Sequence, residues 1–242
     1  MKESARIFDQ VVTERRSVRF YDPEAEFDHE SVKRSLERAV LAANSSNMQL
    51  WEFYRITSAD LLQKMVPICM NQNAAKTARE LVVFVARPDL WRSRQKVLLE
   101  EMKRVYGDRE DKQAKRAFHY YESLIPKYYF NDPFRIWGTI KKILYFFIGL
   151  KQPMVRHGNG TDVRISVHKS VALAAQTFML SMKAEGYDTC PMEGMDSIRV
   201  KKLLKLPRKA EVVMVMGCGP GSEKGIYSER FRLPNEVVIF ER

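Results

Sequence analysis

Residues 81–86 form an uninterrupted apolar run of strand length, Leu-Val-Val-Phe-Val-Ala, and no other segment constrains the fold as strongly. A strand without polar side chains has no face to turn to water, so it must be covered on both faces. Val212–Met216 predicts a second strand of this kind. Alternation predicts another strand at Trp51–Thr57, and Glu236–Phe240 predicts a last strand near the C-terminus. A strand so late in a chain often pairs with a remote partner, including another chain.

Residues 167–182 carry apolar side chains almost all round a helix, which predicts that this helix is central. Gly186 suits the cap at its C-terminal end. An earlier helix is predicted to begin after Asp28 and to end in the polar cluster of residues 44–49. With 242 residues, 45% of them hydrophobic, the chain can build one substantial core but not two. We therefore expect a single domain over residues 1–242.

Residues 88–160 differ from the rest of the chain and form a helical insert rich in Lys, Arg, Tyr and Phe. Its helices are predicted to break at one glycine and three prolines, namely Gly107, Pro126, Pro133 and Pro153. Within the insert, Ile143–Ile148 is strongly apolar but far shorter than the roughly 20 residues of a transmembrane helix. We expect this run to be buried in the core or at a subunit interface. An interfacial membrane anchor is the alternative.

The charge balance and the cysteines exclude several classes of protein. The net charge of +11 suits nucleic acid, anionic membrane or phosphorylated ligands, but the basic residues are scattered and no nucleic-acid module is recognisable. Cys69, Cys190 and Cys218 are odd in number and far apart, which predicts neither a disulfide framework nor a metal site. The four histidines lack metal-ligand spacing. With no apolar signal segment at the N-terminus, a reducing, cytoplasmic location is expected, without stable membrane insertion.

Two basic segments at opposite ends of the chain suit a phosphate group. Arg15, Ser17 and Arg19 alternate, with Arg16 between them, so an extended backbone would point the three to one side. Arg230 and Arg232 alternate in the same way more than two hundred residues later. Guanidinium groups bind phosphate bidentately, and a serine hydroxyl adds a donor. Taken alone, a segment of this kind is more typical of a solvated basic turn.

Three further segments suit the edge of a ring that alternates hydrogen-bond donors and acceptors. Two of them are rich in amide and hydroxyl groups, which both donate and accept. The third combines proline, which fixes the backbone, with glycine, which permits close approach. Each has an ordinary alternative, a helix stop or a tight surface turn. The segments are Asn44-Ser45-Ser46-Asn47-Met48-Gln49, Asn71-Gln72-Asn73 and Pro191-Met192-Glu193-Gly194.

The order and residue types of these segments together resemble the flavin-dependent nitroreductase family. The likeness covers roughly residues 1–87 and 164–242. It lies in a basic N-terminal signature, a serine/asparagine loop before a tryptophan strand, a proline–glutamate–glycine segment and a basic C-terminal segment. These are Glu14–Asp22, Ala43–Trp51, Pro191–Gly194 and Arg230–Pro234.

The resemblance implies an α+β sandwich with a central, mainly antiparallel sheet flanked by helices, and a homodimer that exchanges its C-terminal strands. It implies FMN at the subunit interface, reduced by NADH or NADPH in a ping-pong reaction that passes a hydride to an electron-poor acceptor such as a nitroaromatic or a quinone. It assigns the FMN phosphate to Arg15, Arg16, Ser17, Arg230 and Arg232.

The resemblance also assigns contacts with the flavin ring. Arg19 lies near the N1/O2 end, where a cation stabilises negative charge on the ring. Asn71 contacts the pyrimidine edge, and the backbone of Glu193 and Gly194, which follow Pro191 and Met192, faces N5. The partner subunit contributes Asn44, Ser45, Ser46 and Asn47. No side chain of the protein is expected to act as a catalytic residue, because the flavin carries the chemistry, and no metal is expected.

The chain departs from the family pattern at Leu50 and Ala43, where proline is usual or frequent, and at Ala74, where some members carry a lysine. The insert at about residues 88–160 lies outside this likeness, and the resemblance implies that this region covers the active site. A specialised flavin reaction, such as reductive dehalogenation or flavin fragmentation, is therefore the alternative function. A non-enzymatic protein that binds a membrane surface or nucleic acid is a third hypothesis. The insert's tyrosines either stack on an aromatic acceptor or pack the insert; they are Tyr120, Tyr121, Tyr128 and Tyr129.

Overall fold

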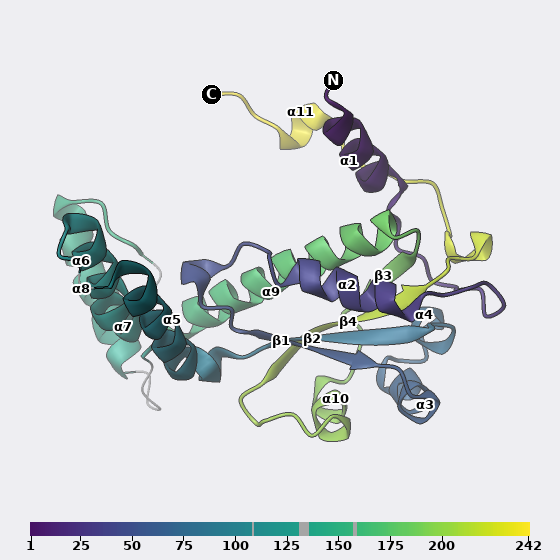
Figure 1. Cartoon of the computed structure of the whole chain (residues 1–242), viewed down its shortest axis with the longest axis horizontal. Helices are drawn as coiled ribbons and strands as arrows, with labels where there is room; N and C mark the ends of the chain where they lie inside the picture. Colours follow the sequence, from purple (N-terminus) through teal and green to yellow (C-terminus); the bar gives the residue numbers. More distant parts are fainter. Residues whose placement is uncertain (108, 131–135, 157–158) are drawn as a thin grey trace.

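A computed structural model describes residues 1–107, 109–130, 136–156 and 159–242. Its centre is an antiparallel sheet in the order β1-β2-β4-β3, with helices on both faces (Figure 1). The α+β sandwich that the resemblance implies is confirmed. The strands are β1 (Trp51–Ile56), β2 (Glu80–Ala86), β3 (Asp188–Met192) and β4 (Glu211–Gly219). The helices outside the insert are α1 (Glu3–Glu14), α2 (His29–Ala39), α3 (Ala59–Ile68), α4 (Asn73–Lys76), α9 (Gly160–Ala184), α10 (Ser197–Leu203) and α11 (Asn235–Val238).

Strand β2 lies between β1 and β4, and every one of its residues is buried. Its alternating side chains enter two different hydrophobic clusters. Phe84 packs on the α9 side, where it contacts Phe178 at 5.5 Å between ring centroids. Val83 belongs to the opposite cluster, which contains Met65 of α3 and Val200 of α10. The predicted burial on both faces is therefore confirmed.

Helix α9 is central, as its sequence predicts, and both of its ends are capped. Asn159 and Asp162 form a capping box at the N-terminus. At the other end, Gly186 has φ +88°, and the backbone N–H of Tyr187 donates to the carbonyl of Met182 at 2.9 Å. This confirms the predicted glycine cap.

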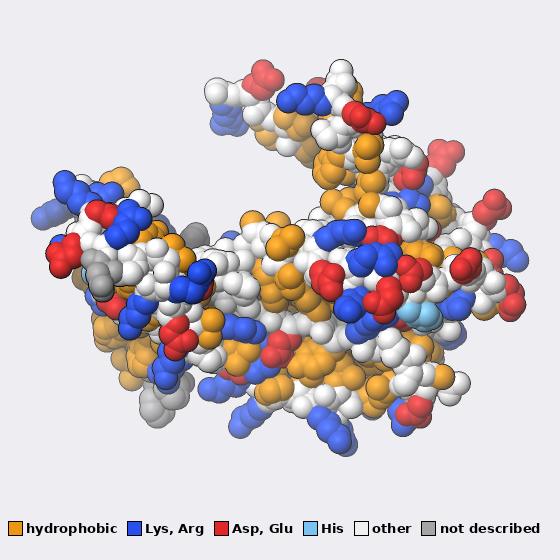
Figure 2. All heavy atoms as spheres, viewed as in Figure 1, with side chains coloured by type: hydrophobic (Ala, Val, Ile, Leu, Met, Phe, Trp, Pro, Cys, Tyr) orange, Lys and Arg blue, Asp and Glu red, His pale blue; other side chains and the backbone are white. Residues whose placement is uncertain are grey.

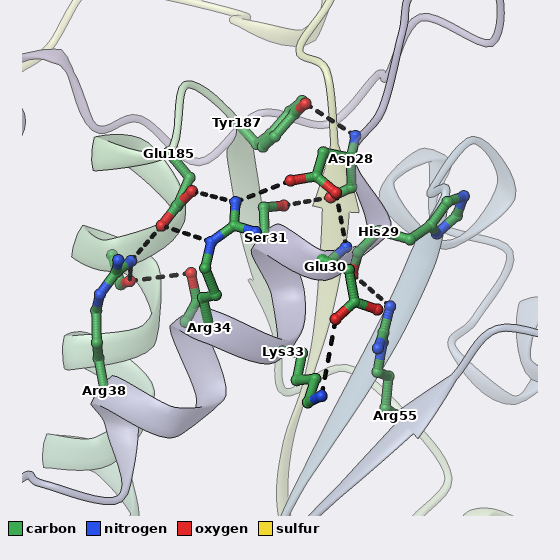
Figure 3. A network of polar contacts seen from close by, with 12 residues as sticks. Asp28, His29, Glu30, Ser31, Lys33, Arg34, Arg38, Arg55, Glu185 and Tyr187 are labelled. Atoms are coloured by element: carbon green, nitrogen blue, oxygen red, sulfur yellow. Dashed lines mark hydrogen bonds and ion pairs between the residues drawn. The ribbon is translucent and has the colours of Figure 1, made fainter.

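A polar network joins α2 to the C-terminal end of α9 (Figure 3). Asp28 caps α2 by accepting from the backbone N–H of Glu30 at 2.9 Å, as predicted. Arg34 donates to Asp28 at 2.8 Å and to Glu185 at 2.6 Å. Because Asp28 begins one helix and Glu185 follows the other, these bonds hold the helices in register.

The structure corrects the sequence analysis at two strands. Pro191 and Met192 belong to β3 rather than to a loop after the central helix. Proline is compatible with an edge strand, since its missing N–H can face away from the ladder. The predicted strand Glu236–Phe240 is wrong for this chain: residues 235–238 form the short helix α11. Among the residues that the structure describes, no strand pairs with them, and a helix satisfies backbone groups locally.

The insert projects from one end of the molecule (Figure 1). Gly107 ends its first helix as predicted, but Pro126 breaks nothing, because it occupies the first turn of α7 directly after a π-helical turn. Pro133 and His157 lie outside the described residues. The elements are η2 (Pro88–Leu90), α5 (Trp91–Tyr106), α6 (Lys112–His119), η3 (Tyr120–Leu124), α7 (Ile125–Tyr129) and α8 (Ile136–Lys151).

The apolar run Ile143–Ile148 forms part of α8, but it is not buried in the core of this chain. Ile143, Leu144, Phe146 and Phe147 are each more than half exposed. The prediction of a core position is therefore wrong. The reason is that α8 packs on the insert through other residues, described below. None of the described helices is both long and apolar enough to cross a bilayer.

All three cysteines are buried and free. Burial raises the pKa of Cys69 to about 11 and the pKa of Cys190 and Cys218 above the ordinary thiol value. At pH 8, a thiol of pKa 11 is only about 0.1% thiolate, compared with about 10% at a pKa of 9.

We therefore expect a thiol reagent such as Ellman's reagent to label the native protein at pH 8 at least about a hundredfold more slowly than the unfolded chain. Three thiols should react in guanidinium chloride. Rapid labelling of one thiol under native conditions would contradict this burial.

Candidate functional site

The N-terminal segment of residues 18–20 lies between the edge strand β3 and the chain segment that follows β4. The backbone N–H of Val18 donates to Thr189 of β3 at 3.1 Å, and that of Arg19 donates to Gly225 at 2.9 Å. On the same segment, Phe20 accepts from the N–H of Ser222 at 2.9 Å. A side chain at position 225 would lie 2.5 Å from Val18, so only glycine permits this approach.

This arrangement brings both basic segments to one cavity of about 250 Å³. Its wall contains, among other residues, five arginines from opposite ends of the chain together with Ser17 and Tyr227. All of these except Tyr227 belong to the two basic motifs of the sequence. The arginines are Arg15, Arg16, Arg19, Arg230 and Arg232.

The arginines carry uncompensated charge. Burial lowers the pKa of Arg15, and the neighbouring charges of Arg230, Arg232 and Arg16 lower it further. In the part of the chain that the structure describes, no carboxylate forms an ion pair with these arginines, although Glu229 lies in the cavity wall. Arg16 instead donates to the carbonyl of Ser228 at 2.6 Å, and Arg230 donates to the carbonyl of Arg15. Such a cluster favours an anion.

The segment around residue 71 and the Glu193–Gly194 segment lie next to this cavity. The Arg19 guanidinium lies 5.0 Å from the centre of the Tyr227 ring, whose hydroxyl accepts from Asn73 at 3.2 Å. The neighbouring Gln72 side chain donates to the carbonyl of Gly194 at 2.7 Å. A chain of contacts therefore leads from the arginines to the segment that the resemblance assigns to flavin N5.

The Asn44–Asn47 segment lies elsewhere. It forms η1 (Ser45–Asn47), and the backbone N–H of Ser45 donates to the Ser170 hydroxyl of α9 at 3.2 Å. Ser46 contacts the insert, since its hydroxyl lies 2.5 Å from that of Tyr120 and its carbonyl accepts from Tyr121 at 2.9 Å. Figure 1 places the insert and the end of α1 at opposite ends of α9. One chain alone does not bring this segment to the arginines.

Both amide-rich segments contain residues with the left-handed backbone that favours glycine. Positive φ values between 49° and 56° occur at Ser46, Asn47, Gln49, Met70 and Asn71. At Asn71 this backbone ends α3, because its N–H donates to Val66 at 3.0 Å. Such conformations cost on the order of 1 kcal/mol or more and often accompany binding sites. They turn these short segments out of the helices that precede them.

His29 and His168 lie outside the wall of this cavity. His29 contacts the buried carboxylate of Glu80, and His168 lies 2.7 Å from Glu211. Both contacts join a histidine to a carboxylate within the fold. No group of metal-ligating side chains occurs among the described residues.

The substitution Arg232→Gln tests whether the like charges in the cavity destabilise the protein when no ligand is bound. The only hydrogen bond described for the Arg232 side chain goes to the carbonyl of Phe231, its own neighbour, at 2.7 Å. We expect the ligand-free variant to be as stable as the wild type or up to about 1 kcal/mol more stable at low salt, because like charge is removed. The gain should shrink in 0.5 M salt. Thermal unfolding measures this, and a clear loss of stability at low salt would contradict the charge argument.

Comparison with known proteins gives consistent results. A model described as the nitroreductase family matches residues 12–220. Protein DrgA of Synechocystis is 26% identical over 232 residues, which span 96% of this chain and 92% of DrgA. "Putative NAD(P)H nitroreductase MhqN" of Bacillus subtilis is 27% identical over 235 residues, 96% of this chain and 98% of MhqN. The "CLA biosynthesis enone reductase" of Lactiplantibacillus plantarum is 19% identical over 223 residues, 91% of this chain and 88% of the enzyme.

Solved structures share the fold. YdfN of Bacillus subtilis aligns with a TM-score of 0.75 at 19% identity, over 98% of this chain and all of YdfN. A protein of Exiguobacterium sibiricum, solved in complex with FMN, aligns with a TM-score of 0.65 at 22% identity, over 97% of both chains. With its fold, its order of motifs and the family match over most of its length, the chain belongs to the nitroreductase family of flavin-dependent oxidoreductases.

Proposed function

We propose that this protein is an FMN-dependent NAD(P)H oxidoreductase that passes a hydride to an electron-poor acceptor of the nitroaromatic or quinone class. The observation that carries the proposal is the arginine cavity, with its cationic side chains from both chain ends and no carboxylate partner among the described residues. FMN in a structural relative and NAD(P)H in the name of MhqN support it. When bound, FMN would supply the hydride chemistry.

The donor set fits the phosphate of such a cofactor. Arginine guanidinium groups and a serine hydroxyl are the groups that bind phosphate best in proteins, and the volume of about 250 Å³ admits one. We propose that the phosphate binds in this cavity. The residues that would hold it are Arg15, Arg16, Ser17, Arg230 and Arg232.

The contacts that lead away from the cavity suggest where the ring binds. We propose that Arg19, held over Tyr227, stabilises negative charge at the N1/O2 end of the ring. Asn71 would contact the pyrimidine edge. Glu193 and Gly194 are exposed directly after the edge strand β3, so their backbone is accessible to N5. Pro191 and Met192 would fix this approach from within β3.

We propose that the protein works as a homodimer. Three surfaces support this: α1 buries none of its residues, the C-terminal residues 231–242 are exposed, and α9 exposes Leu173 and Ile165. Figure 2 shows an open recess between the arm formed by α1 and α11 and the body of the molecule. A second subunit in this recess would bring its own Asn44, Ser45, Ser46 and Asn47 to the flavin, and its insert over the active site.

We propose a cytoplasmic location for the protein, because three buried cysteines with free thiols are compatible with a reducing compartment.

The cofactor proposal predicts that the purified protein is yellow and that FMN is released on denaturation. Replacing both Arg230 and Arg232 by Ala should weaken FMN binding by at least about a hundredfold, since each charge-assisted contact contributes about 1.5–3 kcal/mol. Flavin fluorescence titration measures the affinity. Arg104→Ala, which removes an exposed arginine paired with Glu101, is the matched control and should bind FMN normally. Equal affinities for the double variant and the control would contradict the site.

Two candidate reactions differ in the chemical class of the molecule that accepts the hydride. A second subunit would bring its insert over this flavin, together with a cleft of about 440 Å³ between the insert and the core. The wall of that cleft includes Trp91, Phe130 and Arg92, which suits an aromatic or anionic acceptor. The enone reductase relative makes an activated alkene the second candidate. Of the four tyrosines at positions 120, 121, 128 and 129, Tyr120 is the most exposed, at 38%, and it has the most surface available to an acceptor. Tyr121 and Tyr128 pack against the core, and Tyr129 is largely buried in the wall of the cleft.

We expect anaerobic oxidation of NADH or NADPH to be fast with nitroaromatics and quinones. Rapid turnover of these generic acceptors would disfavour specialised reactions such as dehalogenation or flavin fragmentation. Turnover confined to enones or halogenated aromatics would overturn the generic assignment. The consumption of NADH and NADPH at 340 nm, with one acceptor of each class at equal concentration, distinguishes them.

A further inference from the structure

Helix α8 turns a broad apolar face to solvent. Ile140, Ile143, Phe146, Phe147 and Leu150 are between 47% and 66% exposed. At 100° per residue they occupy one side of the helix. Figure 1 places α8 at the end of the molecule away from α1 and α11, and Figure 2 shows hydrophobic side chains at the outer edge of this end.

The fold does not use this face. The buried residues of α8 are Gly138 and Lys141. A side chain at position 138 would meet Asn159 at 3.4 Å, so the helix comes close at this point. The Lys141 ammonium group donates to the carbonyls of Lys127 and Phe130, at 2.9 and 3.1 Å, near the end of α7. The helix is therefore attached by its small and polar side.

The charged residues of α8 and of the segment directly after it are all basic. Residues 136–156 contain Lys141, Lys142, Lys151 and Arg156 and no acidic residue. Lys142 and Lys151 are exposed, and Arg156 donates to the carbonyl of Gly149 at 2.8 Å. An apolar face with cations beside it is the pattern of a helix that lies in the headgroup region of an anionic bilayer.

From this face and its charge we infer that α8 docks the protein on the surface of a membrane that contains anionic phospholipids. Its 16 residues extend about 24 Å, less than the roughly 30 Å of a hydrocarbon core, so it lies along the surface rather than across it. The phenylalanines and isoleucines enter the acyl boundary, while Lys142 and Lys151 bind lipid phosphates. This inference is independent of the flavin site.

A second copy of the chain fits this face less well than a membrane does. If α8 met α8 of a second copy, the cations of the two helices would come together without any acidic residue of this segment to balance them. The surfaces proposed for the dimer lie on α1, α9, the C-terminal residues and the part of the insert beside residues 44–47. That part of the insert is Tyr120 and Tyr121, which contact Ser46, and it does not include the apolar face of α8.

Vesicle flotation of the full-length, FMN-loaded protein tests the inference. Wild type should float with phosphatidylcholine vesicles that contain 30 mol% phosphatidylglycerol, and far less with pure phosphatidylcholine. Phe146→Glu with Phe147→Glu should lower binding at least about tenfold, because two buried aromatic rings are lost and negative charge is gained. Lys142→Gln with Lys151→Gln should lower binding about tenfold or more on the anionic vesicles alone.

The matched control is Val97→Glu with Ile198→Glu, which changes two exposed apolar residues outside α8 and should bind like the wild type. Circular dichroism and FMN content check folding, and Leu150→Glu gives a second, milder variant of the same face. Sedimentation velocity should give the same mass for all variants. Failure of the wild type to bind anionic vesicles at 50 mM salt would overturn the inference. So would unchanged binding of the phenylalanine variant, or a change in its mass, which would assign α8 to a contact between subunits.

Discussion

The burial of β2 on both faces is the constraint on which the rest of the structure depends. It requires α9 and α2 on one face of the sheet and α3 and α10 on the other. It also buries the carboxylate of Glu80 completely. Arg55 binds this carboxylate through two contacts of 2.5 and 2.7 Å, and His29 is its second partner. A buried charge is tolerated only with such partners, so this cluster ties β1 and α2 to the central strand.

The same sheet order builds the site. Because β4 pairs with β2 on one side and β3 on the other, β3 is an edge strand, and its free edge takes the segment around Val18. The turn after β4 binds the other side of that segment. The two chain ends thus reach the same place, and their arginines meet there at an electrostatic cost, visible in the lowered pKa of Arg15. A bound anion offsets this cost, which is why such a cluster is typical of a ligand site rather than of a stabilising network.

The regions proposed to be functional are those in which the single chain leaves groups unsatisfied. The arginines have no described carboxylate partner, the segments of residues 46–49 and 70–71 adopt unfavourable backbone conformations, and α8 exposes its apolar face. Each is explained by a different partner: an anionic cofactor, a ring held between two subunits, and a lipid surface. The well-packed parts of the chain, by contrast, require no additional binding partner.

Features encoded within a few neighbouring residues were determined by the sequence alone: the buried strand at 81–86, the central helix, the caps at Asp28 and Gly186, and the ordered motifs that indicate the family. Tertiary structure decided whatever depends on a distant partner. It made Pro191 part of a strand, replaced the expected strand at 236–240 by a helix, left α8 exposed, and separated residues 44–47 from the arginines. The physical reason is that helix periodicity and capping are local, whereas strand pairing and burial are completed only by residues remote in the chain or in another molecule.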